Sequence, residues 1–383
     1  MARETVLEQT LGREICMMKR LGDYIRPVDV RNRDLKVTRL VGLTIDKAFI
    51  PSVANTIGTD LSNYKVISEN QFACSLMQVS RDGKMPIAMF KGEPCIMSPA
   101  YPMFEVSKKN ELLPEYLMMW FSRSEFDREA SFYAVGGVRG SLEWNDFCDM
   151  QIPVPAIEKQ REIVAEYNIL ATRIETNKKL IATLEQTAQT LYRHTFVDNI
   201  DPNNLPDGWR MGTLGEDVNC FDFKRKPLSE DERREIKGEY PYYGAISVVD
   251  YINSFIFDGD FILFSEDGAN IIDEFGHPAL QYVWGKFWVN NHAHVLQGND
   301  TVSTEYLYIT LKNVDVHELV TGAAQPKINQ QNMNGIQIVI PDRQTMAYFS
   351  DNAKSLFDAY KLKILENQTL TQMQTLLLSK MGA

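Results

Sequence analysis

Two sets of residues in this sequence have types and spacing that could support metal-dependent chemistry. His292 and His294 alternate across Ala293, so on a strand both imidazoles would point to one face, as two metal ligands do. No cysteine or acidic residue lies close to them in the sequence. A polar loop, or core histidines that are hydrogen-bonded, is therefore the favoured interpretation over a metal site.

The second set is Asp207 followed by Glu235 and Lys237, which resembles the spacing of carboxylates and lysine around a nuclease magnesium ion. However, Asp207 follows Pro206 in what reads as a turn, and Glu235 lies in a charged run typical of a solvated helix. A self-contained nuclease therefore stays an alternative. Magnesium-dependent cutting by the lone chain, lost in Glu235→Ala, would support it.

Other common catalytic signatures are missing from the sequence. It contains no phosphate-binding Gly-x-x-x-x-Gly-Lys-Ser/Thr loop, no Gly-x-Gly-x-x-Gly turn after a strand and no Gly-x-Ser-x-Gly nucleophile elbow. It also lacks an Asn-Pro-Pro-Tyr-like run that could hold an adenine amino group. We therefore expect a non-catalytic chain that binds no cofactor or metal of its own.

Two polar, glycine-containing loops, residues 136–141 and 322–330, indicate recognition. Arginine, lysine, asparagine and glutamine pair with base edges in DNA, whereas serine, lysine and backbone amides suit phosphates. Each residue taken alone could equally belong to a solvated surface loop. The predicted DNA-contact residues are Arg139, Ser141, Gln325, Lys327 and Asn329, followed by Arg81, Lys84, Asn290, Asn291 and His292.

The sequence contains an internal repeat, and the repeated elements must position these loops. Five short segments recur in the same order at offsets of 185 to 193 residues, which is about half of the chain. The recurring pairs start at Leu21 and Leu214, Ser80 and Ser265, Glu115 and Glu305, Gly136 and Gly322, and Met150 and Ile336. This order predicts two similar globular parts, each mixing short strands with helices.

A heptad seam follows each globular part. In the first copy the apolar positions are spaced by four and three residues, and Asn177 interrupts them. At an offset of 190, the weaker second copy places Asn367 in the same register. Asn177 and Asn367 are either register-setting residues or tolerated polar ones. The seams run Ile163, Tyr167, Leu170, Ile174, Asn177, Ile181, Leu184, Ala188, Leu191 and Ala353, Phe357, Tyr360, Ile364, Asn367, Thr371, Gln374, Leu378, Met381.

The predicted fold is therefore α+β, with two similar globular domains joined by two long antiparallel coiled-coil helices in a pseudo-twofold internal repeat. Two long helices in one chain most simply pack on each other, and antiparallel if the halves are related by a pseudo-twofold. The expected boundaries are residues 1–155 for the first domain, 156–198 for the first helix, 199–341 for the second domain and 342–383 for the second helix.

Composition and charge indicate the cellular compartment and the partners of the protein. The 383 residues carry a formal charge of −11, and the excess is concentrated in residues 199–341, with 10 basic and 21 acidic residues. No stretch is apolar enough to span a membrane, and five scattered cysteines favour a reducing, cytoplasmic setting. Because nucleic-acid binding depends on basic residues, we expect the chain to bind DNA poorly alone and to need partners.

Several segments together resemble the specificity (S) subunit of Type I restriction–modification enzymes, and the resemblance covers essentially the whole chain. Residues 152–164 are similar to the start of that family's first conserved helix, and residues 341–344 are a copy two residues shorter between proline and glutamine. Residues 205–216 resemble the start of its second globular part. Further similar segments are residues 255–260, 265–268, 286–293 and 366–370.

The resemblance implies a DNA-reading scaffold with two domains that each read half of a bipartite double-stranded site. The helices would set the unread spacer and hold methyltransferase subunits, most simply two, with restriction/translocase subunits completing the complex. S-adenosylmethionine, ATP and Mg would belong to those partners. Besides the nuclease, the alternative is a coiled-coil adaptor that binds only proteins and leaves no DNA footprint even with partners present.

Overall fold

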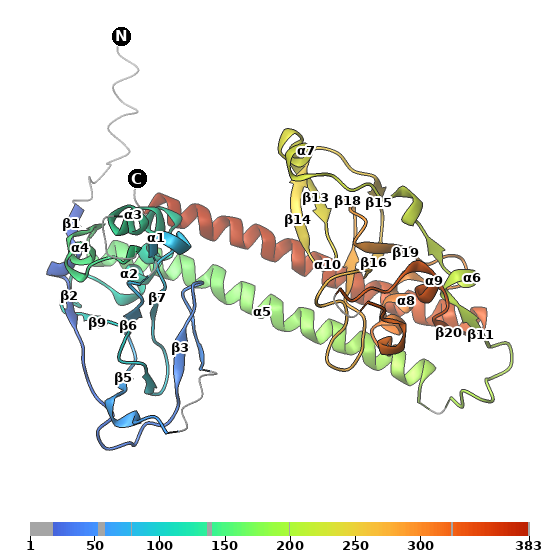
Figure 1. Ribbon diagram of the computed structural model, residues 1–383, viewed down its shortest axis with the longest axis horizontal. Coiled ribbons are helices and arrows are strands. Elements are labelled where there is room, and N and C mark those ends of the chain that lie inside the picture. The colour runs from blue at the N-terminus through green and yellow to red at the C-terminus, as the bar shows by residue number, and fades with distance from the viewer. Residues whose placement is uncertain are drawn as a thin grey trace, which may run out of the picture. The chain divides into compact units, whose positions relative to one another are not determined.

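The computed structural model describes residues 18–52, 58–77, 79–135, 140–198, 200–322 and 325–381. The chain divides into two compact units (Figure 1). The first unit comprises residues 1–176 together with 367–383, and the second comprises residues 177–366. Arg139, one of the predicted DNA-contact residues, lies outside the described residues.

The first unit is built on a four-stranded antiparallel sheet of order β2-β9-β6-β7. Short helices pack on it, and their apolar faces form one core with the sheet, including Phe72, Phe104 and Phe121. Its strands are β1 (Met18–Arg20), β2 (Ile25–Pro27), β3 (Val41–Leu43), β4 (Phe49–Pro51), β5 (Lys65–Ile67), β6 (Gln71–Cys74), β7 (Ile87–Met89), β8 (Cys95–Met97), β9 (Met103–Val106) and β10 (Gln151–Pro153). Its short helices are α1 (Val79–Asp82), α2 (Pro114–Phe121), α3 (Ser124–Ala134) and α4 (Trp144–Asp149).

The second unit has two four-stranded sheets, of order β12-β19-β16-β17 and β14-β13-β18-β15. Its strands are β11 (Arg210–Thr213), β12 (Asn219–Cys220), β13 (Lys237–Tyr243), β14 (Val248–Ile252), β15 (Phe257–Asp258), β16 (Phe261–Ser265), β17 (Leu280–Val283), β18 (Lys286–Val289), β19 (Ala293–Gln297) and β20 (Gln337–Ile340). Its short helices are α6 (Leu214–Asp217), α7 (Glu230–Glu235), α8 (Thr304–Leu311) and α9 (Gln330–Asn334).

The internal repeat is visible in the strand order of the two units. The sheet β2-β9-β6-β7 has the same order and antiparallel pairing as β12-β19-β16-β17, and the pair β1-β10 corresponds to β11-β20. Equivalent backbone hydrogen bonds recur. The Leu21 amide donates to the Met150 carbonyl at 2.9 Å, and the Leu214 amide donates to the Ile336 carbonyl at 3.0 Å.

One sequence anchor of the repeat needs correction. The Leu142 amide donates to the Leu76 carbonyl at 2.9 Å, just as the Ile328 amide donates to the Glu266 carbonyl at 2.8 Å. Leu76, rather than Arg81, is thus the structural counterpart of Glu266. The Ser-x-Asp-Gly similarity misaligned the two copies because an exposed turn can recur by composition without sharing a place in the hydrogen-bond network.

Two long helices, α5 (Ile157–Phe196) and α10 (Arg343–Lys380), each pass from one unit into the other. All nine predicted seam positions of α5 are buried or half-buried, and of the nine in α10 only Thr371 is exposed. The heptad pattern therefore predicted the contact face of both helices.

Within each unit, the early part of one long helix packs with the late part of the other, which makes their directions antiparallel there. In the first unit, Tyr167 of α5 and Leu378 of α10 contact the same core. In the second, the rings of Phe196 and Phe349 lie 5.0 Å apart. The α+β fold class, with a β-rich part followed by a long helix twice over, is confirmed. No helix among the described residues is long and apolar enough to cross a membrane.

Candidate nucleic-acid interface

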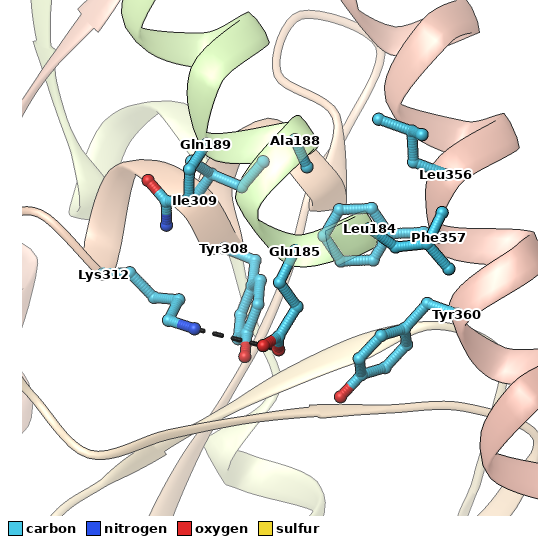
Figure 2. Close-up of a pocket in the computed structure, with 10 residues that line it drawn as sticks. All are labelled: Leu184, Glu185, Ala188, Gln189, Tyr308, Ile309, Lys312, Leu356, Phe357 and Tyr360. Carbon is cyan, nitrogen blue, oxygen red and sulfur yellow. Dashed lines mark ion pairs between the residues drawn. The ribbon is translucent and has the colours of Figure 1, made fainter. Parts of the chain in front are cut away.

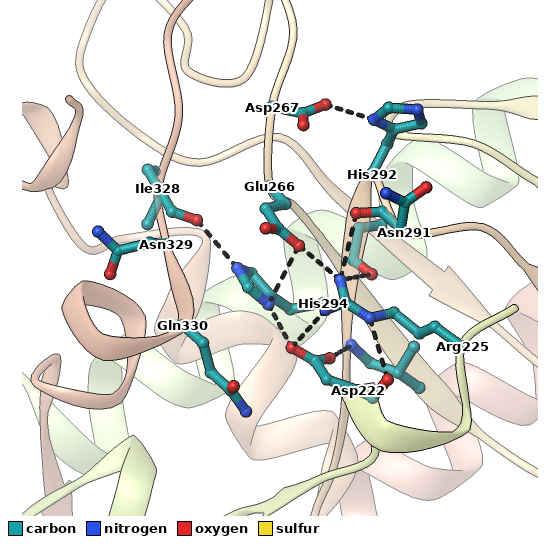
Figure 3. Close-up of polar contacts among 12 residues, drawn as sticks. Asp222, Arg225, Glu266, Asp267, Asn291, His292, His294, Ile328, Asn329 and Gln330 are labelled. Carbon is teal, nitrogen blue, oxygen red and sulfur yellow. Dashed lines mark hydrogen bonds and ion pairs between the residues drawn. The ribbon is translucent and has the colours of Figure 1, made fainter. Parts of the chain in front are cut away.

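Three loop segments of the second unit come together at one end of the sheet β12-β19-β16-β17 (Figure 3). Strand β16 ends at Ser265, which pairs with Ala293 at the start of β19, so residues 266–268 and 290–292 lie side by side. Residues 326–328 join them, because the Gly268 amide donates to the Pro326 carbonyl at 3.3 Å. Five predicted contact residues, Asn290, Asn291, His292, Lys327 and Asn329, are thereby gathered.

A network of ion pairs supports these segments from beneath. The Arg225 guanidinium lies 2.5 Å from a Glu266 oxygen and 3.1 Å from an Asp222 oxygen, and it donates to the Ala293 carbonyl at 3.0 Å. The Lys327 ammonium lies 2.9 Å from the other Glu266 oxygen. Because Arg225 and Glu266 are almost buried, the network ties all three segments to the sheet.

The carboxylates of this network are held in the charged form. Burial by itself would raise the pKa of Asp222, but the hydrogen bond and charge of His294, the Val295 amide and Arg225 outweigh it and lower that pKa. Burial likewise opposes ionisation of Glu266, whose pKa is lowered overall by hydrogen bonds from Arg225 and Lys327. In turn, the hydrogen bond that Lys327 donates to Glu266 raises the pKa of Lys327.

Some of the predicted contact residues also build the loops. The Asn290 side-chain oxygen accepts a hydrogen bond from the His292 amide at 2.9 Å, and the Asn329 side chain caps α9 by accepting from the Asn332 amide at 2.8 Å. His292 bonds to Asp267 at 2.6 Å. Lys327 and His292 remain about half exposed, and Gln325 and Asn291 are exposed. These four can reach a ligand.

The first unit holds a smaller counterpart. Ser141 precedes Leu142, which bonds to Leu76, and the Ser80 hydroxyl donates to the Gly140 carbonyl at 3.4 Å. Gly140 has a φ of +71°, and a Cβ there would meet the Ser80 hydroxyl at 2.1 Å, so the turn requires glycine.

Arg81 and Lys84 are exposed near that turn. Arg81 pairs with Asp82 at 2.6 Å, and Lys84 lies 3.5 Å from Asp46 at the tip of the β3–β4 hairpin. Residues 79–84 and 140–141 are therefore brought together in the first unit, as the loops are in the second. Each lysine or arginine keeps more than half of its side chain in solvent, which leaves its charge available to phosphate.

The metal-dependent alternatives find no assembled site in the described parts of the chain. His294 is fully buried and hydrogen-bonded to Asp222 and Ile328, as a core histidine is, and no cluster of three metal-ligating side chains occurs among the described residues. Glu235 is the last residue of α7, and Asp207 lies three residues before the start of β11. Figure 1 shows α7 well away from β11. The Lys237 ammonium is paired with Asp250.

A hollow between α5, α8 and α10 in the second unit is a feature of helix packing (Figure 2). Leu184, Tyr308, Phe357 and Tyr360 line it, and the charged groups at its edge, Lys312 and Glu185, face each other at 4.0 Å. Its apolar wall has the character of a core gap and does not present groups arranged for a reaction.

Sequence reasoning missed the buried acidic residues of the site, Asp222 and Glu266, which pair with Arg225. Glu266 was noticed only as part of a recurring segment. The signal that could have found Glu266 is an acidic residue directly after β16, whose residues are apolar except for Ser265.

Comparisons with known proteins agree with the resemblance. Residues 206–373 match the family model described as the Type I restriction modification DNA specificity domain. The chain is 33% identical over 128 residues to a candidate type I restriction enzyme specificity subunit of Haemophilus influenzae, covering 33% of this chain and 32% of that protein. It is 22% identical over 295 residues to the MjaIX specificity subunit of Methanocaldococcus jannaschii, covering 68% and 65%.

Two more comparisons extend over most of the chain. The HindI specificity subunit of Haemophilus influenzae is 22% identical over 362 residues, covering 71% of this chain and 77% of that protein. The fold resembles the crystal structure of a Type-I restriction-modification system S subunit from M. genitalium, with a TM-score of 0.59, 14% identity and 95% of each chain covered. Residues 206–373 of this chain belong to the Type I DNA specificity family.

Membership in the specificity-subunit family places the three gathered loops inside the matched region, since residues 206–373 include all of them. Specificity subunits are generally non-catalytic. The first two relatives are matched over about a third and about two thirds of their own lengths.

Proposed function

We propose that this specificity subunit reads a bipartite double-stranded DNA site within a Type I restriction–modification complex, one half-site for each target-recognition domain. The observation that carries the proposal is the gathering of exposed polar side chains at one sheet end, where residues 290–292 and 325–327 both meet residues 266–268. The exposed or half-exposed residues there are Lys327, His292, Asn291 and Gln325. Their side chains supply the donors and acceptors that pair with base edges and phosphates.

The repeat supports one reading surface in each unit. The hydrogen bond from Leu142 to Leu76 and that from Ile328 to Glu266 put residues 140–141 and 326–327 at the same structural position. At this position the first unit has Ser141 and the second has Lys327. A shared scaffold with different side chains at its loop is what two domains that read different half-sites require.

The long helices are suited to set the spacing between the half-sites. Helix α5 has 40 residues, which at 1.5 Å per residue gives about 60 Å. One turn of DNA is about 34 Å, so a helix of this length is on the scale of the gap between two half-sites. A fixed helix length would therefore fix the number of unread base pairs.

The exposed face of α5 in the second unit offers a docking surface for the methyltransferase subunits. The hydroxyls of Thr183, Thr187 and Thr190 donate to carbonyls one turn earlier, at 2.7 to 2.9 Å, so they are satisfied within the helix. Together with Ala182, Gln186, Leu191 and His194 they line a shallow groove. Small side chains of this kind let a partner helix approach closely.

The partners would also supply what this chain lacks. Methyltransferase subunits, most simply two, and restriction/translocase subunits would carry S-adenosylmethionine, ATP and Mg in the cytoplasm. The charge of −11 argues that the chain alone binds DNA weakly and that positive surface comes from those subunits.

The test is a salt-titrated selection from a randomised duplex library, using this chain co-purified with its methyltransferase subunit. Two short motifs separated by a constant unread gap would support the proposal. Replacing residues 322–330 should then change one motif and leave the other. One continuous motif would contradict the bipartite site, and no enriched sequence would favour the protein-only adaptor.

A further inference from the structure

His294 is a fully buried polar side chain next to Ile328 and Asn329, which lie in the loop of residues 322–330 (Figure 3). It lies on β19, and both of its ring nitrogens are engaged. Nδ1 lies 2.5 Å from an Asp222 oxygen, and Nε2 lies 2.9 Å from the Ile328 carbonyl oxygen. The imidazole thus joins the strand β19, the segment after β12 and the loop that carries Lys327 and Asn329.

The chemistry of the two acceptors fixes where the protons are. A carbonyl oxygen only accepts hydrogen bonds, so Nε2 must carry a proton and donate it to Ile328. The Asp222 carboxylate also accepts from the Val295 amide at 2.9 Å and lies 3.1 Å from Arg225, as an ionised group does. Nδ1 lies against this carboxylate, so the ring is held on both of its nitrogen sides.

The charged groups around His294 are paired. Two carboxylates, Asp222 and Glu266, contact the almost buried Arg225 guanidinium, and Glu266 lies 3.8 Å from His294 Nδ1. Paired buried charges avoid the cost of isolated ones. Lys327, the most exposed member of the network, carries the remaining positive charge toward solvent.

The equivalent place in the first unit is occupied by groups that cannot form this tether. Pro102 lies two residues before Phe104, which pairs with Phe72, just as His294 lies two residues before Leu296, which pairs with Ile262. Proline has no side-chain donor, and Leu76 stands where the second unit has Glu266. The polar network is therefore particular to the second unit, although the surrounding backbone repeats.

We propose that His294 is a positioning residue for sequence reading by the second target-recognition domain. Its Nε2–H holds the Ile328 carbonyl, while the Ile328 amide is held by the Glu266 carbonyl. Ile328 lies between Lys327 and Asn329, so the hydrogen bond from His294 is the side-chain contact that sets the orientation of this peptide and of both neighbours. This inference rests on the proposed function. Base contacts tolerate only small displacements, because a bidentate pair needs both of its hydrogen bonds to be in reach.

A matched pair of variants separates the two ring nitrogens. His294→Gln places an amide donor near the position of Nε2 and keeps the bond to Ile328, whereas His294→Asn places it near Nδ1 and keeps only the bond to Asp222. The control is Val295→Ala, which removes buried apolar contacts on the same strand but leaves the Ile328 tether intact.

Each variant is assembled with the co-purified methyltransferase subunit and assayed with the randomised duplex library, and its thermal unfolding is measured. We expect His294→Asn to lose about 10- to 100-fold of the discrimination in the half-site that changes when residues 322–330 are replaced. The other half-site should be unaffected. His294→Gln and Val295→Ala should keep both motifs, whatever their melting temperatures.

Equal loss of both half-sites, or no loss in His294→Asn, would overturn the inference, as would loss in His294→Gln. If His294→Asn does not assemble, Asp222→Asn decides the question, because it removes the partner of Nδ1 and leaves the Nε2 donor. Retained discrimination in Asp222→Asn supports the inference, and its loss in that half-site contradicts it. If the wild-type complex enriches no sequence, that result contradicts the proposed function itself, before any variant of His294 is compared.

Discussion

At the scale of single residues, the polar side chains that matter most are those that satisfy buried backbone groups. Gln160 is fully buried near the start of α5. Its amide donates to the Glu111 and Pro155 carbonyls at 2.7 and 2.8 Å, and its oxygen accepts from the Leu113 amide at 2.9 Å. One side chain thereby fixes the angle at which the long helix leaves the first unit.

Gln160→Ala leaves these three backbone groups without partners inside the protein. We expect it to lower the free energy of unfolding by about 3 kcal/mol, because each buried unsatisfied group costs about 1–3 kcal/mol. Urea unfolding followed by circular dichroism measures the change. Lys159→Ala, on the exposed face of the same helical turn, is the control and should change stability by less than about 0.5 kcal/mol. Equal effects of the two would refute this role.

The start of α10 uses a carboxylate for the same purpose. The Thr345 hydroxyl and amide, then the Trp209 indole and the Gln344 amide, donate to Asp342 and lower its pKa from 3.8 to about 2. Because the folded pKa is the lower one, the stabilisation is present above pH 3.8 and is lost as the pH falls toward 2.

Asp342→Asn should therefore melt at a lower temperature than the wild type at pH 7, by about 2–4 °C, and the difference should shrink as the pH falls. Thermal unfolding at a series of pH values between 2 and 7 measures it. A gap that stays constant across this range would show that the charge of Asp342 does not contribute. Asp351→Asn, on the exposed surface of the same helix, is the control.

Lys327 tests whether the gathered loops contact phosphate or bases. If Lys327 binds a phosphate, Lys327→Ala should weaken binding to all sequences alike and reduce the slope of log affinity against log salt by about 1. If it reads a base, one position of one motif should become degenerate instead. Lys312→Ala, at the helix hollow of the same unit, should do neither, and an equal effect there would remove Lys327 from the interface.

The sequence located the exposed half of this site but not the buried half. Asn290, His292 and Lys327 could be picked out because polar side chains recur near glycines and strand ends. Asp222 and Glu266 could not, because an acidic residue has the same local pattern on a solvated turn as in a buried ion pair. Glu266 lies 41 positions from Arg225 and Asp222 lies 72 positions from His294, and only the folded sheet brings these pairs together.

At the scale of elements, the long helices were the most predictable part of the fold and the strands the least. A heptad pattern over 40 residues carries its own periodic signal, and it identified the buried faces of α5 and α10. Strands of three to five residues carry little pattern, and their pairing is non-local, so the order β12-β19-β16-β17 did not follow from the sequence.

The contact between the long helices in the second unit should be a main source of its stability. Phe349 of α10 is fully buried against Phe196 of α5 and Tyr306 of α8. Phe349→Ala should cost about 3–5 kcal/mol, because it leaves a cavity in a packed aromatic cluster. Tyr348→Ala, one residue earlier and mostly exposed, should cost less than about 1 kcal/mol in the same urea titration. Similar values for both would contradict the packing assigned to α10.

At the scale of the whole molecule, two continuous helices pass from one unit into the other, and this gives the proposed spacing role a direct test. Inserting one heptad after Thr176 in α5 and one before Asn367 in α10 keeps each unit intact and keeps the seam in register. The added length is about 10.5 Å, or up to about 3 base pairs.

The library selection on this variant should return the same two motifs with a longer unread gap. An unchanged gap would show that the helices do not set its length. Altered bases in either motif would show that the insertion disturbed the DNA-contacting loops of one unit. Inserting the same seven residues at residue 199, between α5 and β11, leaves the helix lengths unchanged and should leave the gap unchanged.

The division of the long helices between the units also has a consequence for how the protein is made. Leu377, Leu378 and Met381 complete the core of the first unit, yet they follow all of the second unit in the sequence. During synthesis on the ribosome, the first unit therefore cannot complete its core until the last turns of α10 have emerged. Until then, part of its apolar surface is exposed. A nascent chain that stops in the second unit leaves the first one open to chaperones and proteases.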